Sequence, residues 1–478
     1  MNPARTMKTL PRVLFLCACV LLLGVLAGAL VTEASILKYD FDLYVAMGVV
    51  MVAFTGFAIL LDWRLGAFLL GAALPFEDLL TSGFFGSGIK AIGLVTFSSI
   101  GFRLLLDRRL YAKLWHLLQQ PLVLTLLALV CWSTVSISWA TYKEAALVKT
   151  STFIGLFGLV LTIGLLKERE LKLLWAIVAL STVLTVPLGY VLPAPTEDIA
   201  ASGQYTSDRF TSGGLDPNDY GGLLVIVFFV TYYMLSKRFS VAKYVLALPI
   251  FFGLLASESR TALVVLLATP LLMLWMPGAS KRSIKGLLIT YCLLGLVFAG
   301  TIYAVPALGE TILDRYATLS QLQSEETWAG RWELWGAAFR MILSHPLLGV
   351  GVGNFPYVAP TYSAFAEFMN STLGYEGAAT THNILLSMAS ELGPVGLALF
   401  LGALFLAFRQ ALALVDRGSA VGVGLLFGLV AYTLMGLTTS WEAQKIGYFL
   451  LGSILALYSL RTTQNTIPKP EEGEWRQW

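Results

Sequence analysis

The stretch Asn383–Phe408, NILLSMASELGPVGLALFLGALFLAF, carries a single charged residue, Glu391, in an otherwise largely apolar run. As a helix, this run is long enough to cross the roughly 30 Å hydrocarbon layer of a membrane. The short alternating strands typical of an outer-membrane barrel are absent from it. The stretch therefore predicts a transmembrane helix, and comparable segments are found along most of the chain.

The whole composition agrees with this prediction. Of the 478 residues, 57% are hydrophobic and 13% are charged, and the mean hydropathy is +0.75. So few polar groups cannot cover a water-soluble globule of this size. We predict an all-α, polytopic inner-membrane protein with about 12–14 transmembrane helices; the short segment 65–75 and its neighbour can also form one re-entrant pair. The apolar segments are approximately 13–31, 43–61, 65–75, 91–106, 121–139, 145–166, 173–192, 221–235, 241–256, 261–276, 286–306, 383–408, 419–438 and 446–460.

Charge and cysteine content exclude several classes of function. The net charge of +3 is spread over short clusters, so there is no basic face for nucleic acid. The four cysteines lie inside apolar segments without metal-ligand or paired spacing, which predicts neither a disulfide nor zinc. Segment 13–31 follows basic residues like a signal peptide, but cleavage near Cys17 would leave spanning sequence, so we expect an uncleaved first helix. The cysteines are Cys17, Cys19, Cys131 and Cys292.

The distribution of basic residues predicts the orientation. With a cytoplasmic N-terminus, roughly 21 of the 32 Lys and Arg residues fall in cytoplasmic loops or termini, the bias known as positive-inside. Both termini are then cytoplasmic, and the two long polar connections face the periplasm. We divide the chain into N-terminal helices (1–192), a periplasmic loop (193–220), helices (221–306), a large periplasmic helical loop (307–381), C-terminal helices (382–460) and a cytoplasmic tail (461–478).

A few arginines remain on the predicted outer side. Their planar guanidinium groups match phosphate oxygens bidentately, which suggests an anionic, membrane-anchored ligand such as a lipid pyrophosphate. Arg260 follows Ser257-Glu258-Ser259 between two apolar helices, and an ionisable group at that depth is a functional candidate. Pairing with Glu258 at a helix end, or simple solvation, is the structural alternative. These outer residues are Arg209, Arg260, Arg315, Arg331 and Arg340.

His382 is one of three histidines. We expect Thr380-Thr381 to cap the helix that returns to the membrane, which places His382 in its first turn. The helix dipole and nearby arginines would disfavour the protonated imidazole, so a neutral His382 could act as general base for a sugar hydroxyl. A plain interfacial histidine is the alternative. We expect His345, before Pro346, to be structural.

Three further features have competing interpretations. The glycine-rich stretch Gly349–Asn354 lacks the strand and lysine of a nucleotide loop, so we predict a turn that closes the preceding helix. Asp40 and Asp42 could form the metal-binding carboxylate pair of a lipid-sugar glycosyltransferase, although their short loop offers little room. Glu391 lies beside the Gly393-Pro394 kink, either as a structural hydrogen-bond partner or as part of a cavity wall.

Four motifs occur in order between residues 215 and 405. They are Ser257-Glu258-Ser259-Arg260-Thr261-Ala262, Gly330-Arg331-Trp332-Glu333-Leu334-Trp335, His345-Pro346-Leu347-Leu348-Gly349-Val350-Gly351-Val352-Gly353-Asn354-Phe355, and His382-Asn383 followed by Gly393-Pro394-Val395-Gly396. In order and spacing they resemble the shared domain of the O-antigen ligase and O-antigen polymerase superfamily. The His-Asn pair followed by Gly-x-x-Gly is similar to the ligase branch.

The resemblance implies a metal-independent, cofactor-free glycosyltransferase that moves a glycan from undecaprenyl pyrophosphate to a sugar hydroxyl of lipid A-core. It implies that His382 is the base or acceptor-orienting residue, and that Arg260 and Arg331 hold the pyrophosphate. Arg209 resembles a further loop motif less closely. Asn383, Asn218, Arg315 and Glu391 are possible supporting residues. A polysaccharide polymerase with the same donor is the alternative enzyme, and a membrane transporter is the alternative of another class.

Overall fold

The computed structural model describes residues 52–76, 88–191, 216–235, 240–275, 281–304, 326–373 and 379–466. Arg209, Arg315, Asp40, Asp42, Cys17, Cys19 and the predicted helix 13–31 lie outside these ranges. Every regular element within them is helical. Besides Val52–Leu61, they are α4 (Trp63–Ala73), η1 (Leu74–Phe76), α5 (Gly88–Leu106), α6 (Arg108–Leu118), α7 (Pro121–Ser136), α8 (Lys143–Gly164), α9 (Glu168–Val191), α11 (Pro217–Met234), α12 (Ser240–Ala256), α13 (Arg260–Leu274), α14 (Lys281–Ala304), α16 (Glu326–Ser344), α17 (Phe355–Val358), η4 (Ala359–Thr361), α18 (Ala364–Leu373), α19 (Ile384–Asp416), α20 (Ala420–Gly436) and α21 (Lys445–Thr466).

The all-α, polytopic class is confirmed. Within the described residues, α5, α8, α9 and α19 are long and apolar enough to cross a membrane, and a fifth span arises if α6 and α7, bent by 76°, count as one. Shorter apolar helices of 10–17 residues accompany them. Where the structure describes the predicted apolar segments, they correspond to helices, although several boundaries differ. For example, α19 runs to Asp416 instead of ending near 408. Helix α11 begins earlier than 221, because Asp216 caps it and Pro217 occupies its first turn, and α21 runs to Thr466 instead of ending near 460.

Helix α11 forms the centre of the bundle. Its residues from Tyr220 to Tyr233 are buried on all sides, as expected of a helix that is apolar around its whole circumference. It packs against α9, α12, α13 and α20. Close packing requires small residues at the contacts: a Cβ added at Gly221 would lie 2.9 Å from the Cβ atoms of Ser259 and Ala262 on the α13 side.

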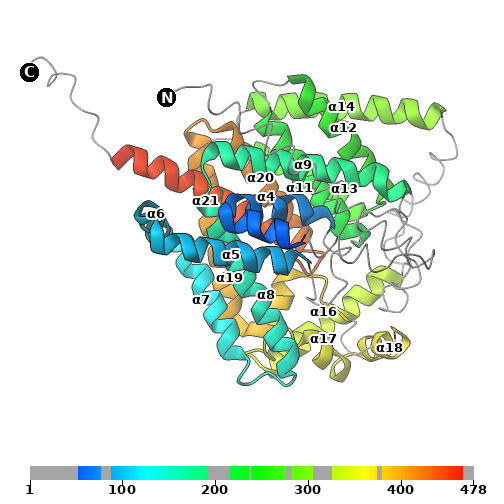
Figure 1. Cartoon of the computed structure of the whole chain (residues 1–478). Helices are drawn as coiled ribbons and strands as arrows, with labels where there is room; N and C mark the ends of the chain where they lie inside the picture. The colour runs from blue at the N-terminus through cyan, green and yellow to red at the C-terminus, as the bar shows by residue number, and fades with distance from the viewer. Residues whose placement is uncertain are drawn as a thin grey trace, which may run out of the picture.

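A smaller second core lies beside the bundle. Helices α16, α17 and α18 group together at the lower right of Figure 1, and they enclose buried residues that include Leu334, Met341, Phe355 and Ala366. This layer falls within the predicted large loop 307–381 and contains its helices α16, α17 and α18. It packs on α19.

Helix α19 is broken, as the sequence predicts, at Gly393-Pro394. Gly393 has φ 65° and ψ −169°, a conformation that a side chain would strain. Proline cannot donate the usual helical hydrogen bond, so carbonyl groups in the preceding turn need other donors. Trp132 Nε1 of α7 donates to the Leu392 carbonyl at 2.9 Å. Val350 N and Gly351 N donate to the carbonyls of Ser390 and Glu391, each at 2.9 Å.

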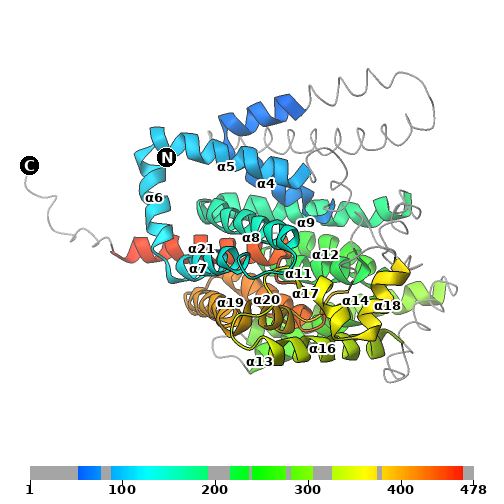
Figure 2. The ribbon, with the colours of Figure 1, turned by 90° about the horizontal axis from the view of Figure 1, so that it is seen from below.

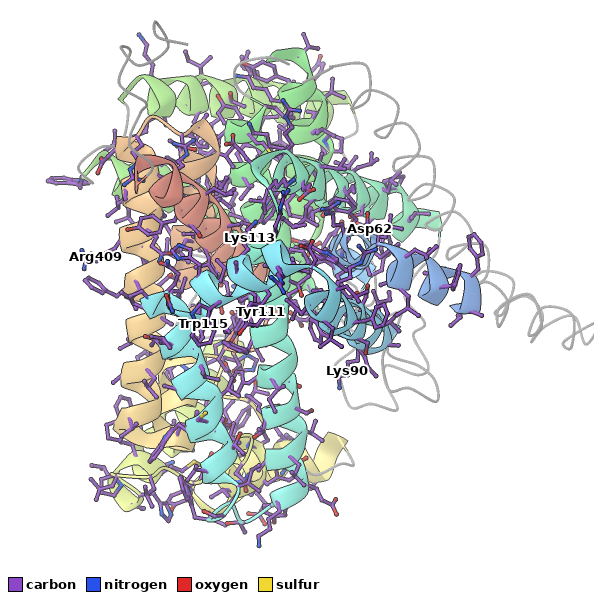
Figure 3. All side chains as sticks on the ribbon, turned by 60° about the vertical axis from the view of Figure 1, so that its left-hand side comes forward. Asp62, Lys90, Tyr111, Lys113, Trp115 and Arg409 are labelled. Carbon is purple, nitrogen blue, oxygen red and sulfur yellow. The ribbon has the colours of Figure 1, made fainter. Side chains whose placement is uncertain are left out.

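One predicted basic loop is instead a helix. Helix α6 connects the ends of α5 and α7 at a steep angle to both (Figure 2). Asp107 caps it by accepting from the backbone of Arg109 and Leu110. Tyr111, Lys113 and Trp115 lie along it (Figure 3). The helix has only a few turns, too short for a bilayer span, and its charged residues alternate with apolar ones. Hydropathy alone therefore missed it.

Basic residues of the predicted cytoplasmic loops gather at one end of the bundle. Lys113 Nζ donates to the Leu165 carbonyl at the end of α8, at 2.8 Å, and Arg64 pairs with Glu170 at the start of α9, at 3.2 Å. Arg417, at the end of α19, lies over the Tyr458 ring near the end of α21. The N-terminal ends of α8, α19 and α21 therefore lie together at the other end of the bundle.

This arrangement generates a topological prediction. In a variant without the natural cysteines, a cysteine at exposed Ser371 in α18 should react with a membrane-impermeant maleimide in intact spheroplasts. A cysteine at exposed Ala112 in α6 should react only after permeabilisation, because the basic end is expected to face the cytoplasm. The reverse labelling pattern would contradict the predicted orientation.

Candidate active site

Three helix N-termini converge at the end opposite Arg64, Lys113 and Arg417. Asp216 caps α11, Ser259 caps α13 and Asn383 caps α19, each through its side-chain oxygen. Ser259 Oγ donates to Asn218 Oδ1 at 3.1 Å, which joins the starts of α11 and α13. Helix N-termini present free backbone N–H groups and a positive dipole end, so this region favours anionic ligands.

The connection between α20 and α21 joins these helix ends. Asn383 Nδ2 donates to the Leu437 carbonyl at 3.0 Å, and Thr438 Oγ1 donates to Thr261 Oγ1 at 3.4 Å. These contacts fix the start of α19 against the start of α13. Residues far apart in sequence thus form one rim around the helix N-termini.

His382 lies in the turn just before α19 and is partly buried. Thr380 Oγ1 lies 3.3 Å from His382 Nε2, and Trp335 Nε1 of α16 donates to the Thr381 carbonyl at 2.9 Å. The expected Thr380-Thr381 cap is wrong: the Asn383 side chain accepts from the backbone of Leu385 and Leu386. Asparagine is among the best capping residues, so His382 precedes the cap and is not part of the first turn.

The environment of His382 keeps its imidazole neutral. Burial lowers the pKa of His382 to about 4, the positive charge of Arg331 acts in the same direction, and the carboxylate of Asp216 opposes them. The expected direction of the shift agrees, but the main cause is burial, ahead of the arginine. The structure thus brings Arg331 on α16 and Asp216 at the start of α11 to the His382 turn.

Arg260 is the first residue of α13. Helix α12 ends at Ala256, so Ser257–Ser259 form a turn with no further loop, as the sequence predicts. Ser259 and Thr261 on either side of Arg260 contact Asn218 and Thr438. The Arg260 side chain therefore originates from the same rim as the His382 turn.

Two residues of this region have a strained backbone. Glu258 has φ 51° and His382 has φ 46°, and no other non-glycine residue in the described ranges has a positive φ. Such conformations cost about 1–3 kcal/mol each and are concentrated at functional sites. Both strained residues immediately precede a capped helix start in this rim.

Other expected site residues have structural contacts. Arg340 donates through Nε and Nη2 to the Tyr362 carbonyl, at 2.9 and 2.6 Å, so it joins α16 to the α17–α18 segment. His345 is exposed at the end of α16.

Gly349, Gly351 and Gly353 have φ values between 68° and 97°, which confirms the predicted turn. Glu391 accepts from the backbone N–H groups of Gly353 and Phe355, at 2.8 and 3.3 Å, and is a structural hydrogen-bond partner.

The sequence interpretation missed four polar residues near this rim. Asp216 lies between Arg209 and Asn218, in the loop motif that includes Arg209, but the motif gives it no particular role. Lys149, within the apolar segment 145–166, carried the signal of an ionisable residue at membrane depth, and it pairs with Glu442 at 2.5 Å. Asp219 accepts from the Trp441 indole at 2.6 Å. No pattern in the sequence indicated the Asp219 contact, which joins residues 222 positions apart.

The part of the chain that the structure describes contains no group of three His, Cys, Asp or Glu side chains able to hold a metal. Asp40 and Asp42, the alternative carboxylate pair, lie outside it, as do Arg209 and Arg315.

Together, the fold and this rim define a multi-pass helical membrane protein with a neutral histidine and arginines beside helix N-termini. Residues 244–401 match the sequence model of the protein family described as O-antigen ligase. The match confirms the resemblance to the O-antigen ligase and polymerase superfamily over this segment, a family that implies a glycosyltransferase-like enzyme. The segment includes Arg260, Arg331, His382 and Glu391, and leaves out Asn218. No match was found among curated proteins.

The lowered pKa generates a testable titration. With ¹³C-labelled histidine, the NMR signal of His382 should remain that of the neutral ring as pH falls from 7.5 through 6.5, and change only near pH 4. Arg331→Gln should raise this pKa, since it removes a positive charge, and Asp216→Asn should lower it further. A midpoint near 6.5 in the unaltered protein would contradict the burial argument.

Proposed function

We propose that the protein is an O-antigen ligase-like glycosyltransferase. It transfers a glycan from undecaprenyl pyrophosphate to a sugar hydroxyl of lipid A-core at the periplasmic face of the bacterial inner membrane. The observation that carries the proposal is the neutral His382 beside Arg331, at an end of the bundle where three capped helix starts and Arg260 meet. Glycan transfer requires a group that accepts the proton of the attacking hydroxyl, which is the role of His382. It also requires groups that stabilise the departing pyrophosphate, which is the role of the arginines.

The reaction follows from their chemistry. The acceptor hydroxyl oxygen attacks the anomeric carbon of the donor glycan, and the bond from that carbon to the pyrophosphate oxygen breaks. Arg260 and Arg331 bind the pyrophosphate and stabilise the charge that develops on it. Pyrophosphate is already a good leaving group, so a positioned base and charge stabilisation are sufficient, and neither metal nor nucleotide takes part.

His382 accepts the hydroxyl proton or orients the acceptor. A base with a pKa of about 4 is weak at neutral pH. The bound pyrophosphate adds negative charge beside Arg331 and offsets its guanidinium, so donor binding raises the pKa of His382 toward the working range. Asp216 acts in the same direction. The histidine thereby becomes an effective base when the donor is in place.

The ligase branch is preferred to the polymerase. The basis is the resemblance of the spacing from His382-Asn383 to Gly393 and Gly396 to the ligase branch. In the structure, Asn383 caps α19 and Gly393 forms its kink. A polymerase would use the same donor with a growing glycan as acceptor. The lipopolysaccharide of a deletion strain distinguishes them, since ligase loss leaves bare core with lipid-linked polymer, whereas polymerase loss leaves core with a single repeat.

A transporter remains the alternative of another class. Glu391 is the residue that most favours it, because a carboxylate at membrane depth suits an ion path. In the structure its oxygens accept from two backbone N–H groups and lie near Lys149. These contacts support a structural role for Glu391 and favour the enzyme.

Replacing the arginines by lysine tests the pyrophosphate site. Arg260→Lys and Arg331→Lys retain the positive charge but lose the planar pair of donors. We expect each to lose transition-state stabilisation on the order of 2–3 kcal/mol, measured as transfer in vitro from a lipid-linked donor. Arg340→Lys, which alters an arginine bonded to a backbone carbonyl, is the matched control. Near-normal transfer by both folded site variants would rule out the assigned roles.

Removing His382 tests the base. His382→Ala should reduce the transfer rate roughly 10²–10⁴-fold if the imidazole is a general base, and less if it orients the acceptor, while donor binding persists. His345→Ala, at the exposed end of α16, should remain active. The assay contains purified protein, donor and acceptor without added metal or nucleotide. A fully active His382→Ala, or an absolute metal requirement, would favour the pair Asp40 and Asp42 instead.

A further inference from the structure

A cluster of three charged residues lies below the rim. Lys149 Nζ of α8 lies 2.5 Å from Glu442 Oε1, which belongs to the α20–α21 connection, and 3.7 Å from Glu391 Oε2 on α19. The side chains of Glu391 and Glu442 are 3% and 2% exposed, and that of Lys149 is 25% exposed. None of the three takes part in the proposed chemistry.

The cluster joins the segments that carry the candidate site. Glu391 accepts from the backbone of Gly353 and Phe355, in the connection that follows α16 and therefore Arg331. Glu442 Oε1 also accepts from Ser387 Oγ at 2.8 Å, in the first turns of α19 after His382. Lys149 bridges the two carboxylates and thereby the two segments.

Glu442 is also linked to the His382 turn through the nearby residue Ser440. Ser440, two residues before it, lies 3.0 Å from Thr381 through their hydroxyl oxygens. Tyr448 OH donates to the Glu442 carbonyl at 2.9 Å and fixes the same connection to α21. A shift of Glu442 would therefore move both Ser440 and Ser387, which hold the His382 turn on either side.

Packing leaves little freedom around Lys149. A Cβ added at Gly353 would lie 3.0 Å from Lys149 Cβ and 2.9 Å from the Ala145 carbonyl oxygen, and Gly353 has φ +72°. Glycine is the residue that tolerates this conformation and this close approach. The backbone after α16 is thus seated directly on the first turns of α8, where Lys149 emerges.

Stability alone does not account for this cluster. Buried ion pairs lose hydration, and well-packed apolar replacements are often equally stable or more so. Two carboxylates facing one ammonium are less favourable still, because the carboxylates repel each other. What the ionic contacts provide is a defined geometry between α8, α19, the connection after α16 and the α20–α21 connection.

We propose that Lys149, Glu391 and Glu442 are positioning residues, which hold the His382 turn in register with Arg331. The inference rests on the proposed function for its catalytic consequence. The cluster acts through its directed contacts and not through its charge alone. Disturbing it displaces His382 from the reacting atoms while leaving the arginines able to bind the donor.

Glu442→Gln is the first test, because it keeps the size and an acceptor for Ser387. We expect the kcat of transfer to fall about 10- to 100-fold, as expected for a catalytic group displaced by about 1 Å, with the donor KM changed less than about threefold. The matched control is Glu168→Gln, which removes the exposed pair of Lys172 and Glu168 at 2.7 Å and should leave both constants unchanged.

A second measurement does not depend on transfer. Diethyl pyrocarbonate modifies neutral imidazoles, and peptide mass spectrometry can follow the three histidines separately. His382 is partly buried, whereas His116 and His345 are exposed and serve as internal references. In Glu442→Gln we expect faster modification of His382 alone. If the unaltered protein shows no transfer, the proposed function fails, but this labelling still tests the positioning role.

Two further variants separate positioning from charge balance. Lys149→Arg should retain more activity than Lys149→Met, since it preserves the contacts to both carboxylates. The triple variant Lys149→Met/Glu391→Gln/Glu442→Gln removes every charge and avoids an unpaired buried ion. It should fold yet remain slow, with His382 exposed to the reagent. Unaltered kcat and labelling in folded Glu442→Gln, or recovery of both in the triple variant, would overturn the proposal.

Discussion

The break in α19 at Gly393 leaves backbone carbonyls that lipid cannot satisfy, and their hydrogen bonds determine much of the structure around them. Two are taken by the backbone of Val350 and Gly351 and a third by the Trp132 indole. The first two bonds dock the segment after α16 onto α19, and the third attaches α7 to the same point. The relative position of Arg331 on α16 and His382 before α19 depends on this docking.

The local features of the fold were predictable from sequence because their causes are local. Long apolar segments become helices, Gly393-Pro394 gives a kink, and Ser257–Ser259 forms a turn without room for a loop. The choice between Thr381 and Asn383 as cap was not predictable in the same way. Thr381 instead bonds Ser440 in the α20–α21 connection and its carbonyl accepts from Trp335. These are tertiary partners that no local pattern contains.

The candidate site was predictable in its residue types and less so in its assembly. Arg260, Arg331 and His382 are recognisable because charged groups are costly near a membrane and motif spacing identifies them. The proximity of Asp216 to His382 and the pairing of Lys149 with Glu442 depend on how α8, α11 and α21 pack. Helix α6 was missed for a different reason: hydropathy detects spans, and an amphipathic helix of three turns has little net hydropathy.

The contact between the Trp441 indole and the Asp219 carboxylate spans 222 positions of the chain, and this has a consequence for biogenesis. Ribosomes deliver the chain to the membrane from its N-terminus, so α11 and α13 are inserted well before the α20–α21 connection has been synthesised. Until then Asp219, Asn383 and Thr261 lack their partners from that connection. The rim is therefore completed only when nearly all of the protein has entered the membrane, so a partly translated chain has no assembled site.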